Sequence, residues 1–178
     1  MAIAFDSLKL EGPVFEDALN QVCFFFQLDA LYDDQVQAIR SFLKGNNVFF
    51  CAGTGYGKSI IFQYMPLLVD ILSDQVVGTS TMIVVSPLVS LMLGQVNKMR
   101  QYGINAVAIF QDQDEDVLND ILDGVYSLVY TSPKSMLGTK KWEKLWKNQT
   151  FMDSCVGIAI DEAHCISQWL VLCFYIYH

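Results

Sequence analysis

The chain has 178 residues, which is enough for one domain with its own hydrophobic core. Hydrophobic residues make up 53% of the chain and charged residues 17%, a composition that excludes intrinsic disorder and favours a well-covered internal sheet. The formal net charge of −8 at pH 7 excludes a global attraction to nucleic acid, so any contact with DNA requires a local basic patch.

The first elements that the sequence predicts are two helices. Apolar residues at helical spacing predict one helix over 14–26 and another over 33–43, with Gly45 as the stop of the second. The apolar run 47–51 then reads as a short buried strand that leads through a glycine-rich loop into a predicted helix over 60–72. A strand, loop and helix unit is therefore expected here.

The same alternation continues to the acidic end of the chain. Each later strand is a β-branched apolar run without an in-out alternation, which indicates a parallel sheet covered on both faces. We therefore predict an α/β fold with a mostly parallel sheet. The strands are expected at 82–86, 105–110, 126–131 and 156–161, and the helices at 88–100 and 112–122.

Neither a disulfide framework nor a membrane segment is expected. The five cysteines show no C-x-x-C pair and no zinc-like spacing, so we interpret them as reduced thiols of an intracellular protein. The N-terminus has no signal-peptide pattern, and no apolar run reaches the roughly 18 residues that span a bilayer. A soluble protein is expected.

The sequence "AGTGYGKS" (52–59) has the spacing of a phosphate-binding loop, with alanine where the stricter pattern has its first glycine. Its glycines let backbone N–H groups turn toward phosphate oxygens, while Lys58 supplies a charge and the Ser59 hydroxyl can ligate Mg²⁺. A chance glycine-rich turn is disfavoured because strand, loop and helix occur in order. The predicted nucleotide-binding residues are Thr54, Gly55, Gly57, Lys58 and Ser59.

An acidic pair closes the last predicted strand, at the end where open α/β sheets place their ligands. Asp161 can hold Mg²⁺ while Glu162 polarises the attacking water. Alone, such a pair is more often a solvated turn, and the phosphate-binding loop upstream is what favours a catalytic role.

The sequences "DEAHCISQW" and "SPLVSLMLGQV" resemble RecQ-type DNA helicases of superfamily 2, over roughly residues 20–169. The resemblance implies a RecA-like motor lobe that binds ATP and Mg²⁺ and couples hydrolysis to 3′-to-5′ separation of DNA strands. It implies that Lys58 and Ser59 bind phosphate and Mg²⁺, that Asp161 is a metal ligand and that Glu162 is the general base. By the same resemblance, Gln35 reads the adenine edge, His164 couples hydrolysis to strand movement, and Gln168 and Trp169 begin a loop that senses DNA.

Two segments match the family's DNA contacts, and both lie where predicted strands end. Backbone amides and hydroxyls at such positions can reach sugar-phosphate oxygens. Without the resemblance, ordinary strand-to-helix punctuation by Ser-Pro is the better interpretation. The residues concerned are Ser86, Pro87, Leu88 and Ser90 in the first segment, and Tyr130, Thr131, Ser132, Pro133 and Lys134 in the second.

The one basic cluster lies at 134–147 and interleaves lysines with Trp142 and Trp146, as single-strand binders do. The favoured alternative is an amphipathic helix whose tryptophans pack on the core while the lysines face water. Two positions depart from the family: Tyr32 stands where a basic residue is usual, and Lys134 replaces an acid.

After Trp169 the chain reads "LVLCFYIYH" where the family continues its aromatic-rich loop. We expect three parts: an N-terminal helical extension over 1–45, a partial ATP-binding lobe over 46–169 and an atypical apolar tail over 170–178. Because helicases of this class hydrolyse ATP between two lobes, we expect no unwinding by the 178 residues alone. We also expect the sheet to lack a strand between the phosphate-loop strand and the acidic strand.

The sequence therefore predicts an ATP-dependent DNA helicase motor with ATP and Mg²⁺ as cofactors and DNA as partner. A nuclear location, and a role in DNA recombination and repair, rest on the resemblance alone, and the oligomeric state is left open. The alternatives are a non-catalytic nucleotide- or DNA-binding lobe and another phosphate-loop enzyme such as a small-molecule kinase.

Overall fold

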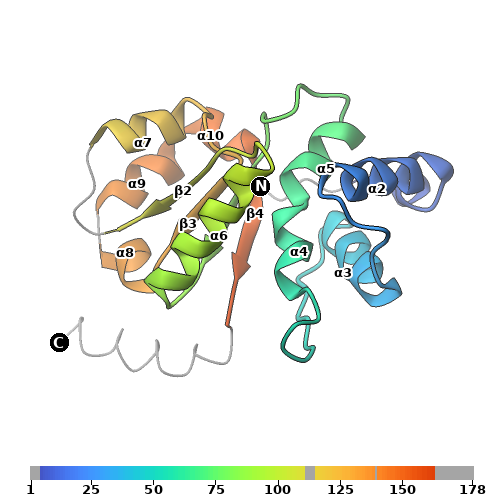
Figure 1. The fold of residues 1–178 in the computed structure, drawn as a ribbon. Coiled ribbons are helices and arrows are strands. Elements are labelled where there is room, and N and C mark those ends of the chain that lie inside the picture. Colours follow the sequence, from blue (N-terminus) through green and yellow to red (C-terminus); the bar gives the residue numbers. More distant parts are fainter. Residues whose placement is uncertain (1–4, 111–114, 139, 163–178) are drawn as a thin grey trace.

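The computed structural model describes residues 5–110, 115–138 and 140–162 of the chain (Figure 1). Four parallel strands form one sheet in the order β2-β3-β1-β4. This confirms the predicted α/β class with a parallel sheet. The strands are β1 (Thr81–Val85), β2 (Ala106–Ile109), β3 (Leu128–Thr131) and β4 (Cys155–Ile160).

Helices precede and connect these strands, and several of their ends follow from local sequence. Pro13 occupies the first turn of α2, where its missing N–H costs nothing. Gly45 follows the end of α3 at φ +86°, a backbone angle that glycine adopts without strain. The helices are α1 (Ser7–Leu10), α2 (Pro13–Phe25), α3 (Asp33–Leu43), α4 (Lys58–Gln63), α5 (Met65–Leu72), α6 (Val89–Gln101), α7 (Glu115–Leu122), α8 (Pro133–Gly138), α9 (Lys140–Lys147) and α10 (Gln149–Ser154).

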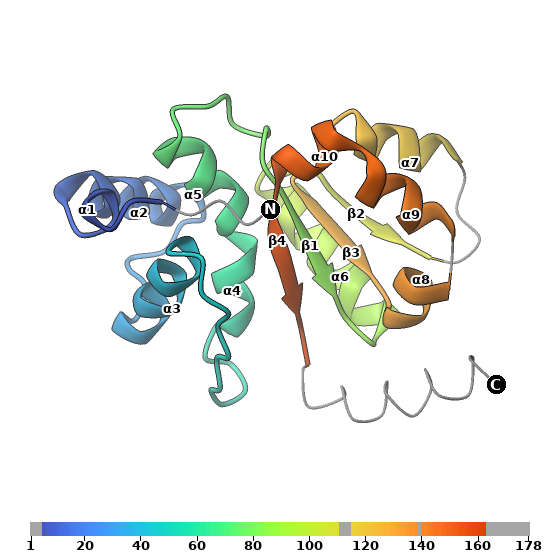
Figure 2. The same cartoon turned by 180° about the vertical axis from the view of Figure 1, so that it is seen from behind.

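Each face of the sheet carries its own hydrophobic core, because successive strand residues point to opposite faces. On one face, Met82 and Val84 of β1 share a core with α2 to α6. On the other face, Ile83 and Val85 pack with α7, α9 and α10. The helices thus lie on both sides of the sheet, as Figure 2 also shows from behind.

The N-terminal helices belong to the first of these cores. Helix α2 packs on α5, and the Phe26 ring just beyond α2 stacks on Tyr64 with 4.1 Å between the ring centroids. The described part of 1–45 therefore shares its core with the sheet, while the predicted domain boundaries stay a prediction.

The predicted strand at 47–51 is wrong, because the structure has no strand there. Val48 is exposed and Phe49 is 84% exposed. A strand needs a neighbour to pair its backbone N–H and C=O groups. Within the described residues, the sheet ends at β4, which pairs with β1 alone, and segment 47–51 does not pair with the free edge of β4.

The predicted helix over 60–72 is two helices, since α4 ends at Gln63 and α5 begins at Met65. Pro66 explains the break, because it has no N–H to donate to the carbonyl of Phe62 one turn earlier. The helix weighed for the basic cluster likewise consists of α8 and α9, and α10 was not predicted. Within the described part of the chain, no helix is both long and apolar enough to cross a bilayer.

Candidate nucleotide-binding site

The phosphate-binding loop lies directly before α4, on the side of the molecule where β4 ends (Figures 1 and 2). Gly55 and Gly57 both have φ +83°, which side chains rarely adopt. A Cβ atom at Gly53 or Gly55 would meet nothing within 4 Å, so the loop is open along its outer side. The open outer side leaves room for phosphate oxygens beside the backbone of this glycine-rich loop.

Lys58 is the first residue of α4, and its side chain folds back over the loop. The Lys58 ammonium donates to the carbonyl oxygens of Ala52 and Gly53, each at 2.9 Å. Its charge is therefore held over the loop, and a phosphate group would compete with these two carbonyls for it. Ser59 follows in the same turn and is half-buried.

Gln35 ties the start of α3 to the phosphate-binding loop. Its Oε1 accepts from the backbone N–H of Tyr32 at 2.9 Å, and its Nε2 donates to the carbonyl oxygens of Tyr56 at 3.0 Å and Gly57 at 3.4 Å. The residue is buried. A Cβ atom at Gly57 would lie 3.0 Å from Gln35 Nε2, so the loop and this amide fit closely. The role of Gln35 toward adenine stays a prediction.

Tyr32 and Tyr56 form a stacked pair beside the loop, with 4.8 Å between their ring centroids. The Tyr56 hydroxyl donates to the Asp34 carboxylate, at 2.7 and 2.8 Å from its two oxygens. That hydrogen bond, together with desolvation and the nearby negative charge, raises the pKa of Tyr56 to about 12. Tyr32 is exposed, so one face of this aromatic pair is open to a ligand.

The acidic pair follows β4. The backbone N–H of Asp161 donates to Val85 of β1 at 2.9 Å. Asp161 is buried, its Oδ1 accepts from the N–H of Glu162, and its Oδ2 accepts from Nε2 of Gln95, both at 3.0 Å. Glu162 has φ +53°, a left-handed angle that costs energy in a non-glycine residue and often occurs at functional sites.

The carboxyl ends of β3, β1 and β4 bring three predicted site residues side by side. Ser86 follows β1 and donates its N–H to Thr131 at 2.9 Å, and Ser132 follows Thr131. Since Val85 pairs with both Thr131 and Ile160, Ser86 lies between Ser132 and Asp161. The two predicted DNA-contacting segments and the acidic pair therefore share one edge of the sheet.

Exposure differs within these segments. Ser86 is fully buried, Pro87 is half-buried and Leu88 is exposed. The Ser132 hydroxyl accepts from the N–H of Ser135 at 3.1 Å and so caps α8. This is the role expected if Ser-Pro marks an ordinary transition from strand to helix. Pro133 begins α8, and Lys134 next to it is exposed.

The basic cluster follows the core-packing alternative. Trp142 and Leu145 are buried, and Trp142 stacks on Trp146 with 5.6 Å between ring centroids. Lys147 is exposed and pairs with Glu143 at 3.6 Å. The buried Trp142 face is thus unavailable for stacking on bases. His164, Gln168 and Trp169 lie outside the described residues.

The donor chemistry suits Mg²⁺ and a nucleotide. Ser59 and Asp161 offer hard oxygen ligands, and Mg²⁺ is usually bound through one or two carboxylates together with phosphate oxygens. The described residues contain no group of three or more His, Cys, Asp or Glu side chains that could form a metal cage. Lys58 and Ser59 would hold the phosphates and the metal, and Asp161 would offer its carboxylate as a further metal ligand.

Sequence reasoning missed three residues of this site: Asp34, Tyr56 and Gln95. Tyr56 and Gln95 were quoted within motifs, but no spacing rule indicates that Gln95 reaches an acid 66 positions later. Asp34 looks like a favourable acid in a first helical turn, and only its contact with Tyr56 reveals a second role.

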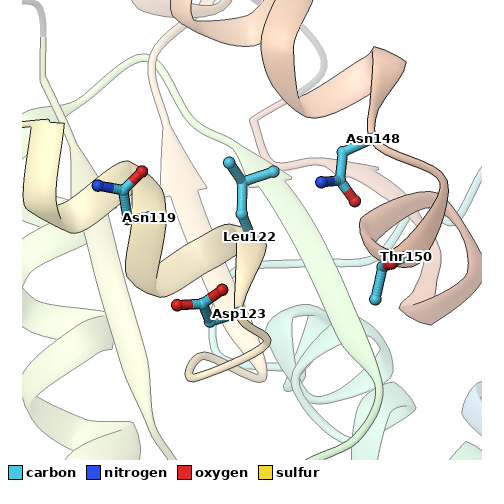
Figure 3. A pocket seen from close by; sticks show the side chains of 5 residues that line it. All are labelled: Asn119, Leu122, Asp123, Asn148 and Thr150. Atoms are coloured by element: carbon cyan, nitrogen blue, oxygen red, sulfur yellow. The ribbon is translucent and has the colours of Figure 1, made fainter.

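A separate hollow of about 710 Å³ lies between the end of α7 and the start of α10 (Figure 3). Figures 1 and 2 place these helices at the opposite end of the molecule from the phosphate-binding loop. The hollow is therefore not part of the candidate site. Its lining residues are Asn119, Leu122, Asp123, Asn148 and Thr150.

Known proteins resemble this chain in sequence and in fold. Residues 32–174 match the DEAD/DEAH box helicase family. The crystal structure of the DUF1998 helicase MrfA bound to DNA and AMPPNP superposes with a TM-score of 0.64 at 18% identity, over 90% of this chain and 22% of that one. At this identity the likeness shows the fold, a RecA-like α/β lobe.

Curated relatives narrow the family. The ATP-dependent helicase SGS1 of Saccharomyces cerevisiae is 31% identical over 92% of this chain and 11% of its own length. The ATP-dependent helicase wrn-1 of Caenorhabditis elegans is 32% identical over 86% of this chain and 14% of its own. The ATP-dependent DNA helicase RecQ of Haemophilus influenzae is 31% identical, with 90% and 24% covered. The chain therefore belongs to the DEAD/DEAH box helicase family, in which it represents a RecQ-like N-terminal lobe.

Proposed function

We propose that this chain is the ATP-binding lobe of a 3′-to-5′ DNA helicase motor of RecQ type. The observation that carries the proposal is the shared side of the phosphate-binding loop and the acidic pair: an open glycine cradle with Lys58 over it, and Asp161 at the end of a parallel strand. When bound, Mg²⁺ neutralises phosphate charge. Because the chain spans 11% to 24% of the relatives above, the activity of the whole protein is part of the proposal.

Each site residue then has a defined task. Lys58 and Ser59 would bind the phosphates and the metal, Asp161 would be a metal ligand, and Glu162 would accept a proton from the attacking water. Tyr32 offers an exposed ring and Gln35 an amide on the adenine side. The segments Ser86 to Leu88 and Ser132 to Lys134 would contact the DNA backbone, through the exposed Leu88 and Lys134. Strand separation in recombination and repair, in a nucleus, is part of the proposal because the resemblance to RecQ-type helicases implies it.

Thermal unfolding of the purified chain with and without Mg²⁺-ATP tests nucleotide binding. Nucleotide at about a hundred times its dissociation constant should stabilise the folded chain by roughly 2.7 kcal/mol. Lys58→Ala should remove this shift, because it deletes the charge over the loop. A shift that survives in Lys58→Ala would contradict the assignment of the phosphate site.

The alternative is a non-catalytic lobe that binds nucleotide or DNA without turnover. Turnover in the presence of single-stranded DNA separates the two. If the chain hydrolyses ATP, Glu162→Gln should lower the turnover number by about a hundredfold or more and keep the thermal shift. A chain with the shift and no turnover would favour the binding lobe.

A further inference from the structure

Gln95 reaches the acidic pair from a different element. It lies two turns into α6, and its Nε2 donates to Asp161 Oδ2 at 3.0 Å. Gln95 is 9% exposed and Asp161 is 8% exposed, so this contact is shielded from water. A hydrogen bond to a carboxylate in such surroundings is stronger than the same bond at a surface.

This contact restricts the orientation of the Asp161 carboxylate. The other oxygen, Oδ1, accepts from the N–H of the very next residue, Glu162, so that bond moves with the strand end itself. The Gln95 bond is different because it fixes the carboxylate relative to a helix. Side chains that hydrogen-bond a metal-binding carboxylate in this way set its orientation and its affinity for the metal.

Two buried polar atoms, one on Gln95 itself and one on Ser86, bear on the role of this contact. Within the described residues, Gln95 Oε1 and Ser86 Oγ are buried and have no hydrogen-bond partner. Ser86 follows β1 at the level where Asp161 follows β4. Natural cores seldom keep such atoms without a use, since an unpaired buried polar group is costly.

Helix α6 also connects this contact to the surface. It begins at Val89, directly after the exposed Leu88 of the first predicted DNA-contacting segment. A helix moves largely as a rigid body, so a displacement of its first turn is carried to Gln95 two turns further on. A group that binds at the segment Ser86 to Leu88 can therefore displace α6, the helix whose Gln95 donates a hydrogen bond to Asp161.

We propose that Gln95 is a positioning residue that orients the Asp161 carboxylate for Mg²⁺-nucleotide, and that through it α6 links the DNA-contacting segment to the acidic pair. The proposal rests on the proposed function of this site. Because coupling between two binding events is reciprocal, DNA should change the affinity for Mg²⁺-nucleotide by the same factor as Mg²⁺-nucleotide changes the affinity for DNA.

Calorimetric titration of the full 178-residue chain with AMPPNP, in Mg²⁺ and in EDTA, tests the positioning role of Gln95. Gln95→Met keeps the side-chain length and removes the amide. We expect unchanged affinity in EDTA and about tenfold weaker affinity in Mg²⁺, since loss of such an outer partner typically costs this much. Gln101→Met, at the exposed end of the same helix, is the matched control and should behave as the unmodified chain does.

Asp161→Asn completes a double-mutant cycle with Gln95→Met. It should remove most of the gain from Mg²⁺, and adding Gln95→Met to it should change nothing further, because the two residues act through one contact. A general loss of packing would instead weaken binding in EDTA as well. If Mg²⁺ increased the affinity for AMPPNP by the same factor in Gln95→Met and in the unmodified chain, the proposal would be overturned.

A spectroscopic measurement covers the case in which Gln95→Met does not fold. In the unmodified chain, the side-chain amide signal of Gln95 in a ¹⁵N–¹H spectrum should shift when Mg²⁺ is added to the AMPPNP complex and should stay in place when Mg²⁺ is added alone. If the position of this signal did not change when Mg²⁺ is added to the AMPPNP complex, the positioning role would be overturned.

Addition of a single-stranded oligonucleotide to the same titrations tests the link. The oligonucleotide should change the affinity for Mg²⁺-AMPPNP in the unmodified chain and in Gln101→Met, and should have no effect in Gln95→Met. Coupling that persists in Gln95→Met, or none in the unmodified chain, would overturn the link. If AMPPNP fails to bind even in EDTA, the proposed function fails first; if only the Mg²⁺ and DNA effects fail, nucleotide binding stands.

Discussion

Tyr56 connects the phosphate-binding loop to the first turn of α3. Its ring stacks on Tyr32, its hydroxyl donates to Asp34, and its carbonyl accepts from Gln35. Through its ring, hydroxyl and carbonyl, Tyr56 thus makes three contacts with residues at the start of α3, and these contacts hold the loop in place. Residues that look like ordinary helix-start positions thus set the shape of the candidate phosphate site.

The hydrogen bond to Asp34 can be tested by titration. The raised pKa of Tyr56, about 12 against 10 for an ordinary tyrosine, means that the contact stabilises the folded chain fully below pH 10 and is lost as pH rises toward 12. Asp34→Asn should bring the pKa back toward 10, as followed by tyrosinate absorbance. Asp33→Asn is the matched control and should leave most of the shift. An unchanged titration in Asp34→Asn would contradict the contact.

At the scale of elements, α3 and β4 meet at one crowded point. A Cβ atom at Gly157 of β4 would lie 2.5 Å from Cζ of Phe42 on α3. The aromatic ring therefore occupies the space that any side chain at this position would need. This contact holds the helix that carries Gln35 against the strand that carries Asp161 at its end.

Gly157→Ala should consequently destabilise the chain by about 1 to 3 kcal/mol, the usual cost of overpacking, although alanine is otherwise favoured over glycine in a strand. Denaturant unfolding measures the change. Gly94→Ala on α6, where a Cβ atom meets nothing within 4 Å, is the control and should stabilise by about 0.5 to 1 kcal/mol. Phe42→Leu should restore part of the loss in Gly157→Ala. If both alanine variants were stabilising, the crowding would be refuted.

For the molecule as a whole, the open edge of β4 is the main consequence of the fold. Ile158 and Ile160 point to the same face and are 43% and 48% exposed. Among the described residues β4 pairs on one side alone, so its other side presents unpaired backbone groups next to apolar side chains. Such an edge is a template for pairing with another chain.

We therefore expect the purified chain to self-associate as its concentration rises. Ile158→Lys should reduce this association, because a charge on an edge strand opposes pairing. Sedimentation velocity at several concentrations is the measurement. Val14→Lys, which places the same charge on an exposed apolar position of α2, is the control and should associate like the unmodified chain. Equal association in all three chains would argue against the edge.

The sequence alone was sufficient for the features that depend on short stretches of chain. The glycine spacing of 52–59 predicted a loop that leads into a helix, and the apolar runs predicted parallel strands with Asp161 at the end of one. These predictions succeed because backbone conformation and strand ends are local properties. The break at Pro66 was readable by the same logic, since a proline inside a helical pattern removes a hydrogen bond.

Only the tertiary structure decided the features that depend on distant neighbours. The run 47–51 has the composition of a strand but forms none, because a strand requires a partner that its own residues do not supply. The basic cluster was open between DNA stacking and core packing until burial placed Trp142 inside. Gln95 and Asp161 lie in contact because β1 and β4 pair, since a contact across 66 positions is set by sheet register and not by local pattern.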